Sequence, residues 1–388
     1  MEKKIRILHI AQSAGGVDRY MRMLLKYVDK EKFENIFVCS QDFKKEDYED
    51  SVIAFEQFPM KRSIGLSDLK AMREVRKLIR KYEPDIVYAH SSKAGAVARA
   101  ADIGLKNFCI YNPHGWAFNM RGSKAKQMLY LAIEKMAAPF CEKIVCISDA
   151  EKQSALEKNI CGARKLTVIF NGVDVEAYKS QKGGQVRREE LGIPEDAFVV
   201  GMVGRISPQK APDIFMEAAK KIKEKIPSAH FVIVGNGELE EQITEYAGNN
   251  GLGDVLHITG WVENPAAYVE LFDVAVLLSR WEGFGLVLPE YMMAGKPVVA
   301  SNVDAIPDVV QDGVSGLLVE ADDPGAAAEA VEKIFCSGEM REELVKCGYE
   351  TVKKRFDAKR MAYESEKLFL ESAAKGRYGY GKNKSAAS

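Results

Sequence analysis

Short runs of β-branched and other apolar residues recur along this chain of 388 residues, and stretches with helical periodicity separate them. Six runs lie in the first half, at residues 5–10, 36–40, 85–90, 108–111, 143–147 and 167–170. Six more lie in the second half, at residues 198–203, 230–235, 255–259, 274–279, 297–301 and 317–319. Because a parallel strand is reached only through a crossover, strands that alternate with helices indicate an α/β architecture. The pattern predicts two doubly wound, Rossmann-like domains that face each other across a cleft, each with its ligand-binding edge at the carboxyl ends of its strands.

A polar stretch at residues 180–188 marks the connection between these domains. We predict an N-terminal domain of residues 1–174 and a C-terminal domain of residues 175–355. Residues 356–374 have a helical pattern, and we expect this helix to return to the N-terminal domain. Residues 375–388 are rich in Gly, Lys, Ser and Ala, a composition that predicts disorder.

The formal net charge of -1 conceals an asymmetry between the two halves. Residues 1–174 contain 30 Lys and Arg against 22 Asp and Glu, a net charge of +8, whereas the remaining residues contain 25 against 34, a net charge of -9. This balance excludes a protein that wraps nucleic acid with a globally basic surface, but the basic half suits an anionic membrane surface or substrate. Seven cysteines without a C-x-x-C spacing favour reduced thiols in a cytosolic protein, and we expect neither a signal peptide nor a membrane span.

Basic residues concentrate in residues 61–81, where only Asp68 and Glu74 are acidic. This cluster consists of Lys61, Arg62, Lys70, Arg73, Arg76, Lys77, Arg80 and Lys81, and a second, smaller one consists of Arg121, Lys124 and Lys126. Such a pattern fits either a solvated helix face or contact with anionic lipid headgroups.

Three loops that follow predicted strands carry residues suited to a phosphate-containing ligand. These residues are Arg205 and Lys210, Gly235 and Gly237, and Gly15 and Gly16. Two cations at the end of a strand suit a diphosphate, and glycines permit a close approach of the backbone to a ligand. Each feature also has a simpler explanation, since exposed cations are common and glycines occur in ordinary turns.

The segment from Ser279 to Val298 gives the clearest functional signal. A buried strand ends, Gly283 and Gly285 free the backbone, and a helix begins near Pro289. Two carboxylates, Glu282 and Glu290, flank the glycines and are eight residues apart. A helix N-terminus that merely favours acids explains one glutamate but not the glycines, so we interpret the segment as a binding site in which the intervening amides point at an anion.

Taken together, these motifs resemble the retaining glycosyltransferases of family 4, which have the GT-B fold. The resemblance covers residues 5–372 and rests on the E-x7-E segment, the Arg205 and Lys210 pair, the Gly15-Gly16 turn and the step Asn171-Gly-Val-Asp174. The segments Ser91-Ser-Lys-Ala-Gly95 and Asn112-Pro-His114-Gly-Trp-Ala-Phe118 are similar to the members that elongate lipid-linked bacterial glycans.

The resemblance implies a role for each candidate residue. Arg205 and Lys210 would neutralise the diphosphate of a nucleotide sugar, Glu282 would hold hydroxyls of the transferred sugar, and His114 would lie near the anomeric centre and the acceptor. The C-terminal domain would therefore bind the donor and the N-terminal domain the acceptor. Glu290 would accept hydrogen bonds from the ribose, and Trp116 would bind the acceptor. The remaining donor-binding residues would be Gly15, Gly16, Gly237, Phe284, Gly285, Leu286 and Val287.

The implied reaction moves a hexose or an N-acetylhexosamine from a nucleotide sugar, expected to be a UDP-sugar, to a lipid-linked saccharide in cell-surface polysaccharide biosynthesis. Retention of the anomeric configuration is also implied by the family. No D-x-D triplet occurs in the chain, so we expect Arg205 and Lys210 to replace a metal ion and no metal or other cofactor to be needed. The basic N-terminal domain would place the protein at the inner face of the membrane as a peripheral protein.

Two alternatives remain open at this point. A nonhydrolysing nucleotide-sugar epimerase has the same two-domain architecture, but it needs further acid and base groups around the sugar, and no second cluster of this kind is evident. A non-enzymatic sugar-binding protein is the other alternative. The isolated histidines His9 and His90 lie in or at the end of apolar strands, and we interpret them as packing or helix-capping residues.

Overall fold

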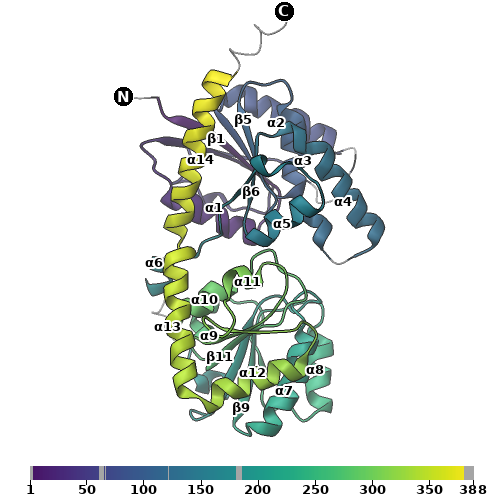
Figure 1. Ribbon diagram of the computed structural model, residues 1–388, viewed down its shortest axis with the longest axis vertical. Helices are drawn as coiled ribbons and strands as arrows, with labels where there is room; N and C mark the ends of the chain where they lie inside the picture. Colours follow the sequence, from purple (N-terminus) through teal and green to yellow (C-terminus); the bar gives the residue numbers. More distant parts are fainter. Residues whose placement is uncertain (1–2, 61–64, 66, 121, 181–185, 380–388) are drawn as a thin grey trace, which may run out of the picture. The chain divides into compact units, whose positions relative to one another are not determined.

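The computed structural model describes residues 3–60, 65, 67–120, 122–180 and 186–379. They form two compact units (Figure 1). Unit 1 combines the residues up to Gly172 with those from Ala358 onward, and unit 2 comprises Val173–Asp357. These boundaries lie two residues from those expected from the sequence. The chain therefore enters unit 2 once and returns to unit 1 through its last helix.

Unit 1 is built on a parallel sheet of seven strands in the order β3-β2-β1-β4-β5-β6-β7. The strands are β1 (Ile5–Ala11), β2 (Phe33–Cys39), β3 (Ala54–Gln57), β4 (Ile86–His90), β5 (Phe108–Asn112), β6 (Lys143–Cys146) and β7 (Leu166–Val168). Six of them coincide with the predicted runs. Sequence analysis missed β3, an edge strand of four residues that pairs only with β2.

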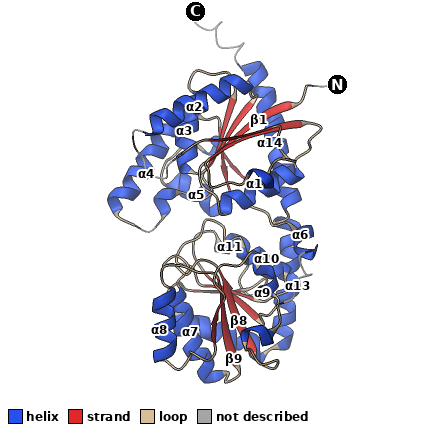
Figure 2. Ribbon diagram, turned by 180° about the vertical axis from the view of Figure 1, so that it is seen from behind, coloured by secondary structure: helices blue, strands red, loops and turns tan. Residues whose placement is uncertain are grey.

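Helices cover both faces of this sheet, as the red strands between blue helices show in Figure 2. The helices of unit 1 are α1 (Gly16–Tyr27), α2 (Ser67–Tyr82), α3 (Ser92–Asp102), α4 (Lys124–Ala137), α5 (Asp149–Glu157) and α14 (Ala358–Gly379). Side chains of α1 and α14 share one apolar core with the sheet, and those of α2, α3 and α5 share the other. The chain is helical to Gly379, so the disorder predicted for residues 375–388 is wrong for residues 375–379, and the rest of that prediction lies outside the described residues.

Unit 2 repeats the architecture with six parallel strands in the order β10-β9-β8-β11-β12-β13. The strands are β8 (Phe198–Val203), β9 (Ala229–Val234), β10 (Leu256–Ile258), β11 (Val274–Leu277), β12 (Val298–Ser301) and β13 (Leu317–Val319). The helices are α6 (Val175–Ser180), α7 (Pro212–Lys225), α8 (Glu240–Asn249), α9 (Pro265–Val269), α10 (Val287–Met293), α11 (Ile306–Val309), α12 (Pro324–Cys336) and α13 (Gly338–Arg355). All six strands coincide with predicted runs.

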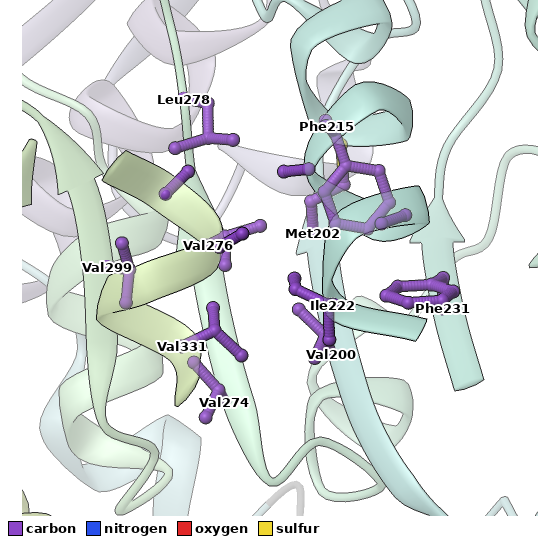
Figure 3. Close-up of a cluster of buried hydrophobic side chains, with 14 of the residues drawn as sticks. Val200, Met202, Phe215, Ile222, Phe231, Val274, Val276, Leu278, Val299 and Val331 are labelled. Carbon is purple, nitrogen blue, oxygen red and sulfur yellow. The ribbon is translucent and has the colours of Figure 1, made fainter. Parts of the chain in front are cut away.

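The core of unit 2 shows why these residues form strands. Alternate residues of β8 and β11 point to one face, where they meet α7 and α12. Figure 3 shows Val200 and Met202 of β8 beside Phe215 and Ile222 of α7. On the neighbouring strands, Val274, Val276 and Val299 pack against Val331 of α12 (Figure 3). The other face is also buried, which explains the continuous apolar runs in the sequence.

Each sheet has one point where the strand order reverses. In unit 1 this switch point lies between β1 and β4, and in unit 2 it lies between β8 and β11. Ligands of doubly wound folds bind at the carboxyl ends of the strands beside such a point. The loops after β1, β4, β8 and β11 are therefore expected to form ligand-binding sites.

Candidate active site

In unit 2, the loops after β8 and β11 are joined into one structure. Lys210, in the loop before α7, forms an ion pair with Glu282, in the loop before α10. The backbone amide of Arg280 donates to the carbonyl of Gln209 at 2.8 Å, and the Gln209 side chain donates to the carbonyl of Trp281 at 3.0 Å. The cation and the carboxylate that the sequence singled out thus share one site at the switch point.

Glu282 is buried and held by several contacts. Its side chain is only 7% exposed. Besides Lys210, the Ser279 hydroxyl donates to its Oε1 at 2.9 Å. Its backbone N–H donates to the Asp304 carboxylate at 3.0 Å. A carboxylate fixed by a cation and a hydroxyl in this way is positioned to accept hydrogen bonds from a polyol.

Arg280 supports this loop and was not identified from the sequence. Its guanidinium forms ion pairs with Asp213 of α7 and with Asp322, which follows β13. It also donates to the carbonyl of Pro208 at 3.0 Å. The guanidinium thus links three segments of unit 2. Arg280 therefore stabilises the loop that carries Glu282.

Unlike Arg280, Arg205 is not held by neighbouring carboxylates of the described chain. Its side chain is exposed, and no residue of the described chain forms an ion pair with it. Gly204, directly before it, has a φ of 156°, and a side chain there would meet the methylenes of Lys210 at 3.4 Å. The loop therefore presents one uncommitted cation and one cation already paired with Glu282.

Gly235 and Gly237 are explained by packing between loops. A Cβ at Gly235 would lie 2.1 Å from the Gly204 carbonyl oxygen, and one at Gly237 would lie 2.3 Å from the Ile206 carbonyl oxygen. Both glycines allow the loop after β9 to contact the backbone of the loop that carries Arg205. Gly237 also borders an open depression lined by Glu238 and other glutamates, an acidic surface that disfavours a phosphate.

The start of α10 agrees with the expected Gly-rich turn, although the helix begins at Val287, two residues before Pro289. Gly285 has a φ of 76°, which only glycine adopts without strain. Phe284 is buried against Phe356, with ring centroids 5.5 Å apart, so its side chain belongs to the core and only its backbone can face a ligand. Leu286 and Glu290 are half-buried in the first turns.

Residues with a strained backbone conformation lie at the same carboxyl-terminal edges of the two sheets. Seven non-glycine residues in the described part of the chain have positive φ, and five of them lie in loops that follow the carboxyl ends of strands. These five are Ser91, His114, Ala211, Asp304 and Asp322. Such strain persists where the surrounding structure enforces it, and it is typical of functional sites.

In unit 1, the loops after β1, β4 and β5 open onto a pocket of about 490 Å³. Its polar lining includes Gln12, Asp68, Lys93, His114, Tyr130 and Glu134. Met72, Val97, Met120 and Ile133 contribute apolar surface. Lys93 and Asp68 form an ion pair within the lining at 2.5 Å. A lining that combines polar and apolar side chains suits a saccharide, which presents both hydroxyl groups and C–H faces.

Glu134 is fixed in the wall of this pocket by residues that the sequence did not identify. Arg99 of α3 donates to it at 2.8 Å, and the Tyr111 hydroxyl donates to its other oxygen at 2.7 Å. The Arg99 guanidinium also lies over the Tyr111 ring, 4.0 Å from its centroid. Gly95 is required here, because a Cβ would lie 2.2 Å from that ring.

His114 lies at the pocket in a left-handed conformation with a φ of 52°. Its backbone N–H donates to the Asn112 side chain at 2.9 Å, and its Nε2 lies 3.0 Å from Nδ1 of His90. Tyr20 packs edge-on against the ring at 4.6 Å. Burial lowers the pKa of His114 to about 3, so the ring is neutral at physiological pH.

Trp116 does not take the position expected of an acceptor-binding residue. It is 2% exposed, and its indole N–H donates to the carbonyl of Glu151 at 2.8 Å. The Glu151 carboxylate in turn accepts from the backbone of Gly115 and Ile147, at 2.7 and 2.6 Å. Trp116 and Glu151 therefore hold the His114 loop from behind.

Gly15 and Gly16 lie where the sequence placed them, at the beginning of α1. Gly15 has a φ of 91°, which requires glycine, whereas nothing in unit 1 crowds Gly16. Within the described residues, no three or more His, Cys, Asp or Glu side chains are grouped so as to hold a metal ion. None of the helices described here combines the length and the apolar character needed to cross a bilayer.

Comparison with known proteins identifies the two halves of the chain. Residues 14–177 match the family model described as Glycosyltransferase Family 4, and residues 185–351 match the model described as Glycosyl transferases group 1.

Two relatives and one solved structure are similar over most of this chain. The UDP-Gal:α-D-GlcNAc-diphosphoundecaprenol α-1,3-galactosyltransferase of Escherichia coli is 32% identical, and the match covers 85% of this chain and 88% of that protein. The capsular polysaccharide biosynthesis glycosyltransferase CapM of Staphylococcus aureus is 28% identical, over 95% and 97%. The structure of Anabaena HepE in complex with UDP has the same fold, with a TM-score of 0.78 at 21% identity, over 95% of this chain and 100% of that one.

Proposed function

Because the chain belongs to the family 4 glycosyltransferases, which have the GT-B fold, we propose that it transfers a hexose or an N-acetylhexosamine from a UDP-sugar to a lipid-linked saccharide. Its membership makes it a glycosyltransferase, which sets aside the epimerase and the non-enzymatic alternatives. The names of its relatives link it to polysaccharide biosynthesis. The observation that carries the proposal is the pairing of Lys210 with Glu282 beside the uncommitted Arg205, at the switch point of unit 2.

The donor binds at this edge of unit 2. Arg205 and Lys210 contact the diphosphate, and the backbone from Phe284 to Val287 supplies further N–H groups. Glu290 accepts hydrogen bonds from the ribose, and Glu282 holds hydroxyls of the sugar. Gly15, Gly16 and Gly237 remain proposed donor contacts; packing accounts for Gly237, and nothing in unit 1 accounts for Gly16. The HepE complex supports a UDP-containing donor, because that protein of the same fold was solved with UDP.

The chemistry follows from the charges at this site. When the sugar departs, negative charge develops on the diphosphate, and the cations Arg205 and Lys210 stabilise it. Lys210 is already held in place by Glu282, so little reorganisation accompanies this step. Because side chains supply the positive charge, we include in the proposal that no metal ion is needed. Retention follows if the acceptor hydroxyl attacks the face of the sugar from which the diphosphate leaves.

The acceptor saccharide binds in the pocket of unit 1, where His114 contacts it. The mixed lining of this pocket supports a saccharide ligand. The relative from Escherichia coli is named for an acceptor in which GlcNAc is linked to diphosphoundecaprenol, which supports a lipid-linked acceptor for this chain.

Contact with the membrane is part of the proposal, and α4, which carries Lys124 and Lys126 of the smaller basic cluster, suits it better than α2. On α2, Arg76 is committed to the carbonyls of Ala101 and Ile103, at 2.6 and 2.8 Å, and Lys77 is paired with Glu74. Lys61, Arg62 and Arg121 lie outside the described residues. Arg73 and Arg80 remain exposed.

Helix α4 has a more suitable surface. Met128, Leu129 and Met136 are 69%, 52% and 66% exposed, and they lie at helical spacing. Lys124, Lys126 and Lys135 are exposed on the same helix. Apolar side chains bordered by lysines suit insertion at the surface of an anionic bilayer. Tyr130, Ile133 and Glu134 of this helix line the acceptor pocket, so α4 would connect the pocket with the lipid surface.

The proposal is tested by incubating the protein with UDP-glucose, UDP-galactose, UDP-GlcNAc or UDP-GalNAc and a GlcNAc-diphosphoprenol acceptor. We expect one donor to give a product one sugar heavier by mass spectrometry, with an α linkage in its proton NMR spectrum. Turnover with excess EDTA should equal turnover without it. A β-linked product would contradict retention, and transfer that EDTA abolishes and Mg²⁺ restores would contradict the roles of Arg205 and Lys210. Donor-dependent release of UDP without any extended product would contradict the acceptor assignment.

A further inference from the structure

Three histidines from separate parts of unit 1 form one continuous chain of hydrogen bonds that ends at the acceptor pocket. Nε2 of His9, on β1, lies 3.0 Å from Oδ1 of Asn35 on β2. Nδ1 of His9 lies 3.2 Å from Nε2 of His90 on β4. Nδ1 of His90 lies 3.0 Å from Nε2 of His114, which follows β5. This chain of hydrogen bonds thus crosses four adjacent strands, from the buried amide of Asn35 to the pocket.

The side chains in this chain of hydrogen bonds are polar, yet they lie in an apolar core. Asn35, His9 and His90 are buried, with at most 3% of each residue exposed. They face the same apolar cluster as Tyr20, Tyr88 and Phe369. Within the described residues, the hydrogen-bond partners of the His9 and His90 rings are Asn35 and the neighbouring histidines. Purely structural packing at these positions would be satisfied by apolar residues, so the polar chain needs another explanation.

The direction of the chain is determined at its inner end. An amide oxygen can only accept, so Nε2 of His9 must carry the proton. A neutral imidazole has one donor and one acceptor, so Nδ1 of His9 accepts from Nε2 of His90. By the same argument, Nδ1 of His90 accepts from Nε2 of His114. Each ring therefore fixes the tautomer of the next.

All three rings are neutral, because their buried environment disfavours the imidazolium. Burial lowers the pKa of His9 to about 4 and that of His114 to about 3. Burial and the two neighbouring imidazoles hold the pKa of His90 well below its ordinary value. The hydrogen bond to Asn35 acts in the opposite direction on the pKa of His9, but burial outweighs it. A carboxylate at position 35 would stabilise a protonated His9 more strongly than this amide does.

We infer that Asn35, His9 and His90 are positioning residues that fix His114 with its proton on Nε2, so that Nδ1 offers a hydrogen-bond acceptor to a saccharide hydroxyl in the pocket of unit 1. Nδ1 of His114 has no hydrogen-bond partner within the described chain, which leaves it available. A His114 in the other tautomer would present an N–H there and could not accept. The identity of the ligand rests on the proposed function, whereas the tautomer of His114 does not.

The tautomers are measured directly by NMR on protein labelled with ¹⁵N-histidine. Only five histidines occur in the chain, and His114→Phe and His90→Phe variants assign the signals. We expect a protonated Nε2 and an unprotonated Nδ1 for His114 in the parent protein at pH 7. A His114 with its proton on Nδ1, or an imidazolium at pH 7, would overturn the inference whether or not the protein transfers sugars.

Two variants of equal side-chain size then separate positioning from packing. Asn35→Leu removes the acceptor oxygen and should give a mixture of both His114 tautomers. The carboxylate of Asn35→Asp favours a protonated His9, whose Nδ1–H then donates to His90, so this variant should leave His114 with its proton on Nδ1. In the transfer assay, Asn35→Leu should raise KM for the acceptor about tenfold, the effect of losing one hydrogen bond, with the Kd of UDP unchanged. Asn35→Asp should raise this KM at least as much, because a His114 that carries its proton on Nδ1 cannot accept there. If Asn35→Leu left the His114 tautomer unchanged, Asn35 would have no positioning role. If it altered the tautomer without changing KM, the saccharide contact would be wrong but the tautomer chain would stand.

Discussion

At the scale of single residues, Arg205 and Lys210 should respond differently to removal, although both carry the proposed charge stabilisation. Arg205 is exposed and has no ion-pair partner in the described chain, so Arg205→Ala removes no internal contact. It should lower turnover by roughly tenfold to a thousandfold without changing Tm. Lys210→Met should lower turnover and also stability, by roughly 2 to 3 kcal/mol, because it leaves the buried Glu282 without its cation.

Both effects are measured as kcat at saturating donor and as Tm by calorimetry, with Lys221→Ala, an exposed lysine of α7, as the matched control. Full turnover in Arg205→Ala would remove Arg205 from the mechanism. An unchanged Tm in Lys210→Met would show that the ion pair contributes nothing to the fold.

A second prediction at this scale concerns Glu151 and the dependence of stability on pH. Burial raises its pKa to about 7 in the folded protein, against an ordinary value of 4.5. Between these values the folded protein keeps the proton and the unfolded chain does not, so this contribution to stability is complete below pH 4.5 and is lost as the pH rises to 7. The free energy of unfolding of the parent protein, relative to Glu151→Gln, should therefore fall by roughly 3 kcal/mol between pH 4.5 and pH 8. Denaturant titrations of both proteins at several pH values measure this difference, and a constant difference would contradict the shifted pKa.

The residues that sequence reasoning located and those that it missed differ in how they are positioned. Lys210 and Glu282 each lie in the loop that follows a buried strand, so the periodicity of the chain was enough to place both at one edge. His9 and His90 were interpreted from the sequence as packing or helix-capping residues, because their hydrogen bonds depend on the strand order β2-β1-β4-β5, which no local pattern encodes. Trp116 shares a short loop with His114, yet its side chain points into the core, and spacing alone does not distinguish the two.

At the scale of secondary-structure elements, α2 and α4 are the two candidates for the proposed membrane contact. Replacing Met128, Leu129 and Met136 of α4 with Gln should weaken binding to anionic vesicles at every salt concentration, because the lost contribution is apolar. Replacing Arg73, Lys77 and Arg80 of α2 with Gln should weaken binding only at low salt, since charge contacts are screened over about 8 to 10 Å near physiological ionic strength. Arg76 is left intact because it supports the end of α3.

Vesicle sedimentation at two salt concentrations distinguishes these outcomes, and UDP binding serves as the control for intact unit 2. Should the α4 variant sediment with vesicles as well as the parent protein does, this helix would be an ordinary exposed surface. If the α2 variant alone lost binding, the interpretation drawn from the basic cluster in the sequence would be the better one.

The elements themselves were predicted well where they are long and buried. Twelve strands were expected from apolar runs, and each of them is present, because both faces of each sheet are covered. Strand β3 was missed because it is short, lies at an edge and contains Glu56 and Gln57. The exposed apolar stripe of α4 was also missed, since the helical pattern of Met128, Leu129 and Met136 looks the same whether it faces a core or solvent.

At the scale of the whole molecule, the last helix determines which unit depends on the C-terminus. Val173, at the start of unit 2, donates to the carbonyl of Phe356 at 2.7 Å, so the two ends of unit 2 meet and the unit is a continuous segment. Unit 1 instead needs α14, whose Met361, Leu368 and Phe369 are buried in its core. The Phe369 ring lies 5.8 Å from Phe33 and 5.7 Å from Tyr88.

Ending the chain after Asp357 should therefore unfold unit 1 and leave unit 2 folded. Loss of three large buried side chains removes roughly 5 to 9 kcal/mol, which is comparable to the whole stability of a domain. Circular dichroism should show the loss of about half of the helical signal, while calorimetry should still detect UDP binding, because Arg205, Lys210, Glu282 and Glu290 all belong to unit 2. A chain ended after Lys375, which keeps these side chains, is the matched control and should match the parent protein in both measurements. Unfolding of the shorter chain at the parental Tm in a single transition would mean that unit 1 does not need α14, and loss of UDP binding would mean that unit 2 does.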